Sequence, residues 1–328
     1  MKFTTLNIRH TGLICRYWNR YAVRSGSGLV YLLIALVFGL SVAHLLISPV
    51  ERLMAKQEKE IGGTDPTIIN MTIVNIGKPI FRFILGPESS EDNSDQKKSL
   101  PAGPKDAAAL ISPENTDANF NSWVHFLLED RPALLSAIFV VLVFSMPFAI
   151  SFLAFNQVTG DIQTYGLRYL LLRTDRSSIY FGRFLGTVIF STVVIAILVL
   201  TITLYLGAKL RIYPAADLAG WAVCGFLALS ILMVPYIALG SLISASVDSP
   251  FLSLVLLKVI ILGVLLLSVL GSLAWEPAKY IKYILPWGWQ NYLLHPDPIY
   301  WGGAAVACVV YAAVYLFLGY YCFEKRDL

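Results

Sequence analysis

Few side chains in this sequence are of the kinds that catalyse reactions or bind metals. The cysteines and histidines stand alone along the chain, at Cys15, Cys224, Cys308, Cys322, His10, His44, His125 and His295. They form neither the paired spacing of a zinc site nor a His-Glu-x-x-His sequence. There is no Gly-x-Ser-x-Gly elbow and no phosphate-binding loop, since Gly77-Lys78 is followed by Pro79. We therefore expect the chain itself to hold no catalytic residue, no metal and no cofactor.

One charged side chain stands deep within an apolar run. Lys258 lies in the sequence Leu-Leu-Lys-Val-Ile, about eight residues or ~12 Å from the inner end of the run. At that depth its ammonium group either extends along its own stem to the membrane surface, pairs within the protein, or faces a cavity and meets an anionic substrate. The sequence leaves these three interpretations open. Under the third, Lys258 lines the translocation cavity.

The elements that must position these side chains are long and apolar. Of 328 residues, 57% are hydrophobic and 14% are charged, and the mean hydropathy is +0.67. Soluble domains are nearer half apolar and a quarter charged, so this composition excludes an ordinary cytosolic enzyme, a disordered chain and a nucleic-acid binder. Six runs are long enough to cross a bilayer core of about 30 Å: residues 29–48, 133–155, 184–207, 218–244, 251–274 and 302–323. Because backbone groups in lipid must bond internally, we expect an all-α integral membrane protein with six transmembrane helices.

Basic residues set the expected orientation of these spans. The net charge is only +4, but the segments expected in the cytoplasm hold eleven Lys or Arg against five acids, whereas 49–132 holds nine basic and thirteen acidic residues. The eleven are Lys2, Arg9, Arg16, Arg20 and Arg24 before the first span, Arg168, Arg173, Arg176 and Arg183 after the second, and Lys325 and Arg326 in the tail. The positive-inside rule therefore predicts that both termini and the 156–183 loop are cytoplasmic. Segments 49–132 and 275–301 are then outside the cell. We expect a multi-pass protein of the inner or plasma membrane.

Apart from the 156–183 loop, three long segments lie outside the spans, and their compositions predict different structures. Residues 1–28 interleave aromatic residues with arginines at helical spacing, which predicts an amphipathic cytoplasmic helix that contacts membrane lipids. Residues 49–132 predict a partly ordered extracytoplasmic insertion containing a linker rich in Pro, Gly and Ser. Residues 275–301 are dense in aromatics broken by prolines, and include Trp275, Trp287 and Trp289. They predict either a partly re-entrant segment or a plain anchor at the headgroup level.

The 156–183 loop resembles that of a known family. Its marked positions are Asp161, Gln163, Gly166, Arg168, Arg173, Arg176-Ser177 and Gly182-Arg183. The loop resembles that of ABC-2 type transporter permeases, where an acidic patch is followed by a glycine, a Leu-rich turn, a Pro-x-Ser-Arg-like corner and a Gly-Lys pair. Asp161 alone represents the acidic patch, Thr174 stands where proline is usual, and Arg183 replaces the lysine. The long 49–132 segment is similar to the subgroup linked with copper-enzyme maturation or gliding systems.

The resemblance implies a permease subunit of an ATP-binding-cassette exporter that works by ATP-driven alternating access. It implies a second permease chain, identical or not, and a pair of ABC ATPase subunits that bind ATP and Mg in place of this chain. The residues implied to couple the loop to the ATPase are Asp161, Gln163, Gly166, Arg168, Arg173, Arg176 and Arg183. The other interpretation of the loop is a basic anchor on the leaflet.

Two other classes of membrane protein stay open. A membrane-embedded lipid-linked transferase would use Asp65, Glu114 and Asp117 to bind a metal, although no histidine orients these acids. A signalling or scaffold membrane protein would need no site at all. The substrate of a transporter and the direction of transport are not indicated by the sequence.

Overall fold

The computed structural model describes residues 8–24, 26–61, 126–127, 131–163, 170–210, 213–274 and 276–326. Helices are the regular elements of this part of the chain. Several predictions fall outside the described residues, namely most of the 49–132 insertion, Gly166, Arg168 and Trp275. They stay predictions.

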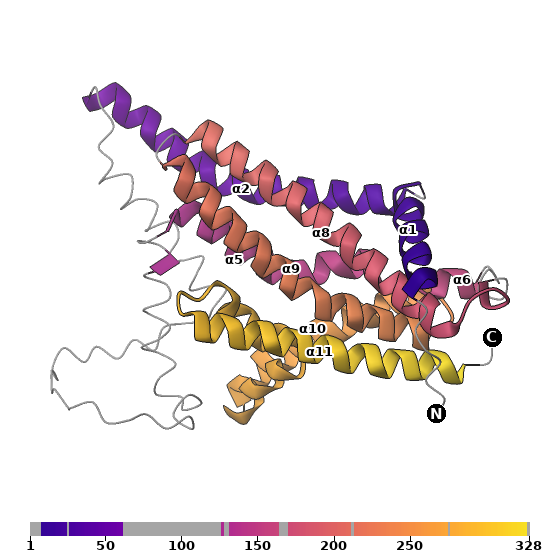
Figure 1. Ribbon diagram of the computed structural model, residues 1–328. Coiled ribbons are helices and arrows are strands. Elements are labelled where there is room, and N and C mark those ends of the chain that lie inside the picture. The colour runs from indigo at the N-terminus through magenta and orange to yellow at the C-terminus, as the bar shows by residue number, and fades with distance from the viewer. Residues whose placement is uncertain are drawn as a thin grey trace.

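The described residues form a bundle of long helices (Figure 1). In chain order the elements are α1 (Ile8–Arg24), α2 (Ser27–Ile61), α5 (Ala133–Ala154), α6 (Thr159–Gln163), α8 (Arg176–Lys209), α9 (Ala215–Ser246), α10 (Pro250–Ala274), the 3-10 helices η3 (Glu276–Ile284) and η4 (Pro286–Leu294), and α11 (Pro298–Lys325). Among them, α2, α5, α8, α9, α10 and α11 are long and apolar enough to cross a membrane. The predicted all-α class with six membrane-spanning helices is therefore confirmed.

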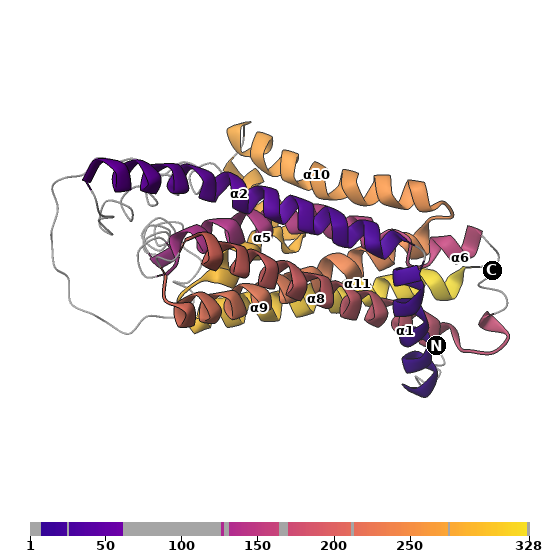
Figure 2. The same ribbon diagram turned by 90° about the horizontal axis from the view of Figure 1, so that it is seen from above.

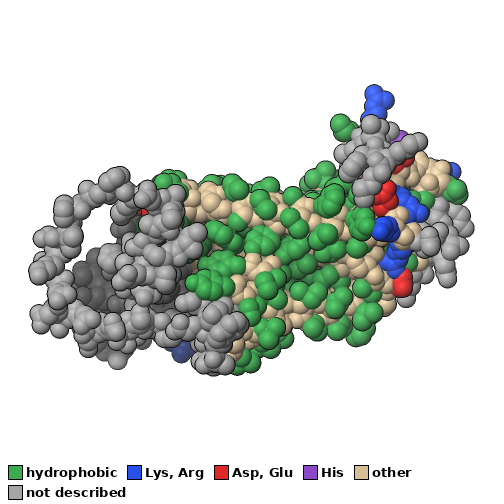
Figure 3. All heavy atoms as spheres, turned by 90° about the horizontal axis from the view of Figure 1, so that it is seen from below, with side chains coloured by type: hydrophobic (Ala, Val, Ile, Leu, Met, Phe, Trp, Pro, Cys, Tyr) green, Lys and Arg blue, Asp and Glu red, His purple; other side chains and the backbone are tan. Residues whose placement is uncertain are grey.

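Burial distinguishes the centre of the bundle from its edge. α5 is the most buried span, with 72% of its most apolar window inside the protein, whereas the corresponding share is 17% for α10. α10 stands at the margin of the bundle when it is seen from above (Figure 2). Hydrophobic side chains cover the middle of the surface in Figure 3, and charged side chains gather at one end of it. This distribution is what lipid requires of the outside of a protein.

The two ends of the bundle carry different elements. The N- and C-termini lie at the same end, together with α1 and α6 (Figure 1), and we call this the termini end. The opposite end carries η3 and η4, and we call it the aromatic end because six tyrosine and tryptophan side chains of 280–300 lie there. α1 crosses the termini end at a steep angle to the spans in both views (Figures 1 and 2).

Two glycines of α8 let α1 approach it closely. A Cβ atom at Gly182 would lie 2.9 Å from Cβ of Ile14, and one at Gly186 would lie 2.8 Å from Cδ1 of Trp18. Gly26 joins α1 to α2 with a φ of 75°, a left-handed backbone that glycine adopts without steric cost. The amphipathic helix is thus fixed against a span rather than attached by its chain alone.

Some helices continue beyond the apolar runs that predict them. α2 extends thirteen residues past position 48, and α8 begins at Arg176, eight residues before the expected span. Hydropathy marks only the lipid-contacting part of a helix, whereas hydrogen bonding continues wherever polar side chains find water or a partner. In the 275–301 segment, η3 and η4 are two short 3-10 helices and α11 starts at Pro298.

Candidate functional site

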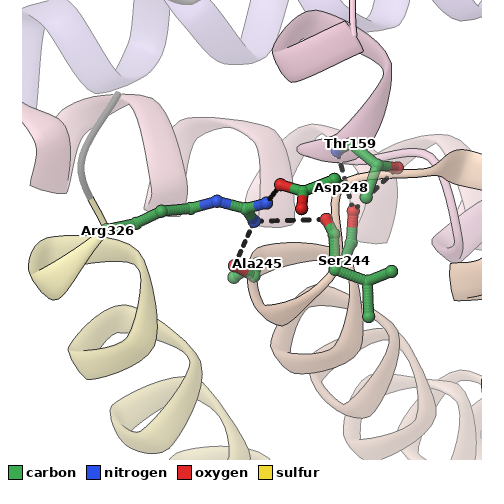
Figure 4. A network of polar contacts seen from close by, with 6 residues as sticks. Thr159, Ser244, Ala245, Asp248 and Arg326 are labelled. Carbon is green, nitrogen blue, oxygen red and sulfur yellow. Dashed lines mark hydrogen bonds and ion pairs between the residues drawn. The ribbon is translucent and has the colours of Figure 1, made fainter.

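The junction between α5 and α6 lies at the termini end and is hydrogen-bonded to neighbouring helices. Its backbone N–H groups at Val158 and Thr159 donate to Oγ of Ser244 in α9, at 2.9 and 3.1 Å. The hydroxyl of Thr159 in turn donates to the carbonyl of Phe155 at 3.1 Å. Figure 4 shows Thr159 and Ser244 facing each other across the α6–α9 contact. Ser244 therefore satisfies the amides at the start of α6, which the short helix cannot pair itself.

Two further side chains bond to Gln157, which lies two residues before α6. Arg183 of α8 donates to the carbonyl of Gln157 at 2.7 Å, and Ser241 of α9 donates to the side-chain oxygen of the same glutamine. Arg183 is only 3% exposed, and its guanidinium lies 5.4 Å from the ring centre of Trp18 in α1. The indole N–H of Trp18 donates to the hydroxyl of Thr187 at 2.9 Å. Arg183 thus connects α1, α8 and the α5–α6 junction.

α10 reaches the same junction through one serine. Ser253 donates at 3.0 Å to the carbonyl of Phe155, the C-cap residue directly after α5. Together, side chains of α8, α9 and α10 hydrogen-bond to four of the five residues 155–159, namely Phe155, Gln157, Val158 and Thr159. A displacement of α6 therefore acts on three spans at once.

Two arginines clamp the helix ends beside this junction. Arg176 at the start of α8 donates to the carbonyls of Glu324 and Arg326 at 2.7 and 3.0 Å, at the end of α11. Arg326 in turn donates to the carbonyls of Ala245 and Val247 at 2.8 and 3.1 Å, and it pairs with the carboxylate of Asp248. Figure 4 shows this side chain extending from α11 to the end of α9. Cations at helix C-termini satisfy carbonyls that have no partner within the helix.

The clamp keeps its charge although it is partly buried. Burial lowers the pKa of the Arg326 guanidinium, but arginine stays protonated in proteins at neutral pH. Because Arg176 bonds to α11 and Arg326 bonds to α9, the ends of α8, α9 and α11 form one unit. That unit lies at the end of the bundle that also carries α6 (Figure 1).

The family comparison decides what kind of protein carries this junction. Residues 20–328 match the model of the ABC-2 family transporter protein. The chain belongs to this family. No curated protein matches the chain. Family membership and the six apolar helices identify an ABC transporter permease, a multi-pass protein of the cell membrane.

The residues predicted to couple this permease to an ATPase separate into two groups. Asp161 and Gln163 lie in α6, which directly follows the junction. Their side chains are outside the described part of the chain. Arg173 lies between α6 and α8 and is exposed. Arg176 and Arg183 point into the protein and bond to backbone carbonyls. A surface contact is thus open to Arg173, whereas Arg176 and Arg183 bind neighbouring helices.

Two of the predicted aromatic residues, Trp287 and Trp289, lie in η4. Trp287 packs edge-on against Phe144 and Phe148 of α5, at ring-centre distances of 5.7 and 6.0 Å. Phe144 is eleven residues into α5, or about 16 Å from its start. Trp289 stacks edge-on with Tyr283 at 5.9 Å. The segment therefore reaches the middle of α5, as a re-entrant element would.

Hydroxyl groups of α11 and the half-buried His295 complete the aromatic end. Tyr315 donates to the carbonyl of Ile284 at 3.2 Å, and Tyr311 donates to that of Tyr283. Burial lowers the pKa of the His295 ring from its usual value, against the opposing effect of the Asp297 charge. In the described part of the chain, no three His, Cys, Asp or Glu side chains gather as metal ligands would. The expectation of no metal and no cofactor stays a prediction.

The sequence did not single out several residues that build the junction. Gln157, Ser241, Ser244 and Ser253 lie at the ends of apolar runs, where isolated polar residues are common. One signal was available, because Ser241 and Ser244 are three residues apart and so share a helix face within a mainly apolar span. For Arg326, the sequence indicates a basic tail and not the bonds to the end of α9.

Proposed function

We propose that this permease works in an ATP-driven exporter, with its termini end in the cytoplasm and the ATPase subunits bound at α6 and the 164–175 segment. The single observation that carries this proposal is the hydrogen bonding of Phe155 and residues 157–159 to side chains of α8, α9 and α10. The described members of the basic set that the positive-inside rule predicts to be cytoplasmic lie at this end as well, in or beside α1, the start of α8 and the end of α11. The ATPase subunits, not this chain, bind ATP and Mg.

In this mechanism the ATPase moves α6 and the junction carries the motion to the spans. Directional hydrogen bonds to backbone atoms resist sliding, so three helices follow α6 together. ATP binding then biases one of two packing arrangements, open to the inside or open to the outside. Arg173 and Asp161 are the proposed contacts with the ATPase, and Arg176 and Arg183 act indirectly by holding the helix ends.

The proposal is tested by co-purification with an ATPase and by vanadate-sensitive ATP turnover of the complex. Asp161→Ala combined with Arg173→Ala should reduce the amount of bound ATPase at least fivefold and reduce turnover in proportion. Lys209→Gln is the matched control, because Lys209 is a cation at the opposite end of the bundle that pairs with Glu51 at 2.9 Å. Normal assembly and turnover in the double variant would overturn the docking assignment.

A second permease chain is the expected partner within the membrane. α10 and α2 support this, because each exposes a long series of apolar side chains, including Val259 at 58% and Val37 at 57%. Cysteines at these positions should form disulfide-linked dimers in vesicles under mild oxidation. A cysteine at Thr201, in the exposed outer half of α8, serves as the comparison.

A further inference from the structure

Charges inside the described spans are rare and of one sign. Measured from the ends of the candidate membrane spans, of which that in α2 is Gly28–Arg52, Arg183 and Lys258 are the charged residues that lie more than one turn inside, and both are cations. Arg183 is buried against Gln157 and Trp18. Lys258 is in a different situation, because it lies on α10, the least buried span, and its side chain is partly exposed.

The ammonium group of Lys258 is held between α10 and α5. Its Nζ donates to the carbonyl of Phe148 at 2.7 Å and lies 3.9 Å from the ring centre of Phe152. Phe148 is six residues, or roughly 9 Å, from the inner end of α5. The side chain thus turns sideways onto α5 instead of extending to the membrane surface. No carboxylate among the described residues forms an ion pair with it.

An aromatic stripe leads away from Lys258 along α5. Phe144, Phe148 and Phe152 recur every four residues, so they share one face of the helix. None of the three is buried, although most of α5 is. Trp287 of η4 contacts Phe144 and Phe148, so the stripe continues to the aromatic end. One cation therefore stands at the inner end of an apolar track that is partly open.

We propose that Lys258 binds the acidic headgroup of an anionic, lipid-like substrate, and that the α5 stripe with Trp287 contacts its apolar chain. The inference rests on the proposed transport function and names its substrate class. A cation without a carboxylate partner complements a phosphate or carboxylate, and an ammonium has three donors, of which Phe148 accepts one. A neutral polysaccharide would use neither the charge nor the apolar length of the track.

Lipid binding tests the site without any ATPase. Native mass spectrometry counts the phospholipid retained by the protein from micelles that contain equal amounts of phosphatidylglycerol and phosphatidylcholine. The wild type should retain phosphatidylglycerol selectively, and K258Q should bind it about tenfold more weakly, as expected for losing one hydrogen bond to a charged group. K258R should keep most of the selectivity. K209Q changes the same net charge at the exposed end of α8 and should behave like the wild type.

ATP turnover then distinguishes a substrate from a resident lipid. In vesicles of phosphatidylcholine, adding phosphatidylglycerol should stimulate vanadate-sensitive turnover of the wild-type complex and of K209Q, but not of K258Q. Equal phosphatidylglycerol binding by wild type and K258Q would overturn the site. Binding that depends on Lys258 without stimulation in an active complex would overturn the substrate assignment. Absence of any turnover in the wild-type complex would instead contradict the proposed function, while the binding result still decides the headgroup site.

Discussion

The termini end and the aromatic end of this permease are held together by different forces. At the termini end, side chains of α8, α9 and α10 and of Arg326 after α11 hydrogen-bond to backbone atoms of neighbouring segments, and these groups are buried or partly buried. At the aromatic end, stacked and edge-on rings predominate, with the hydroxyl bonds of Tyr311 and Tyr315 added. Hydrogen bonds fix direction as well as distance, whereas ring contacts tolerate several geometries. The first end is suited to transmitting a displacement and the second to accommodating one.

Of the variants that test this contrast, Arg183→Ala is expected to lower the free energy of unfolding most. It removes the donor to the Gln157 carbonyl and the cation next to Trp18, in a site that water does not reach. The expected loss is roughly 3 kcal/mol of unfolding free energy, measured by chemical or thermal denaturation in detergent. Arg173→Ala, an exposed cation in the same segment, should change it by less than about 0.5 kcal/mol. Equal effects of the two variants would abolish the distinction between a buried joint and a basic surface.

Ser244→Val should have the next largest effect. It leaves the amides of Val158 and Thr159 without their acceptor, at an expected cost of about 2 kcal/mol. Amide hydrogen exchange in α6 should accelerate at least tenfold, since the start of that helix is no longer bonded to α9. Ser246→Val is the matched control, because the Ser246 hydroxyl bonds only to its own helix, at Leu242. Unchanged exchange in α6 would show that Ser244 does not hold the junction.

Two variants at the Arg326 clamp distinguish the stabilisation that comes from bonding to carbonyls from that of the ion pair with Asp248. Arg326→Ala should lower the unfolding free energy by about 1.5 kcal/mol, because the Ala245 and Val247 carbonyls lose their donor. Asp248→Asn should lower it by less than about 0.5 kcal/mol, since the aspartate side chain is 87% exposed and its pairing is screened. If Asp248→Asn proves as costly as Arg326→Ala, the ion pair rather than the helix capping stabilises the clamp.

The smallest effect is expected at the aromatic end. Trp287→Leu removes two edge-on ring contacts, at a cost of about 1 kcal/mol beyond lost apolar area. Tyr315→Phe removes one partly exposed hydroxyl and should cost less than about 0.5 kcal/mol. Both variants should keep normal ATPase binding in the co-purification assay. Loss of ATPase binding in either would mean that the two ends are not mechanically separate.

Much of the fold was predictable from sequence because the lipid imposes a simple rule on it. Each apolar run of sufficient length became a spanning helix, and the family resemblance of the 156–183 loop is confirmed by the family match. The joint itself was not predictable, because Val158 and Ser244 are 86 residues apart and neither is unusual locally. Arg173 and Arg183 look alike in a sequence. The packing of α1 on α8 buries Arg183 next to Trp18, whereas Arg173 stays exposed.

The length of α2 has a practical consequence. At 1.5 Å per residue its 35 residues extend about 52 Å, which exceeds the 40–45 Å of a whole bilayer with its headgroups. Ala55, near the far end and exposed, is therefore well placed as an attachment point beyond the membrane. A membrane-impermeant maleimide should label Ala55→Cys in intact cells only when that end of the bundle is outside. One labelled position thus reads out the sidedness of the whole permease.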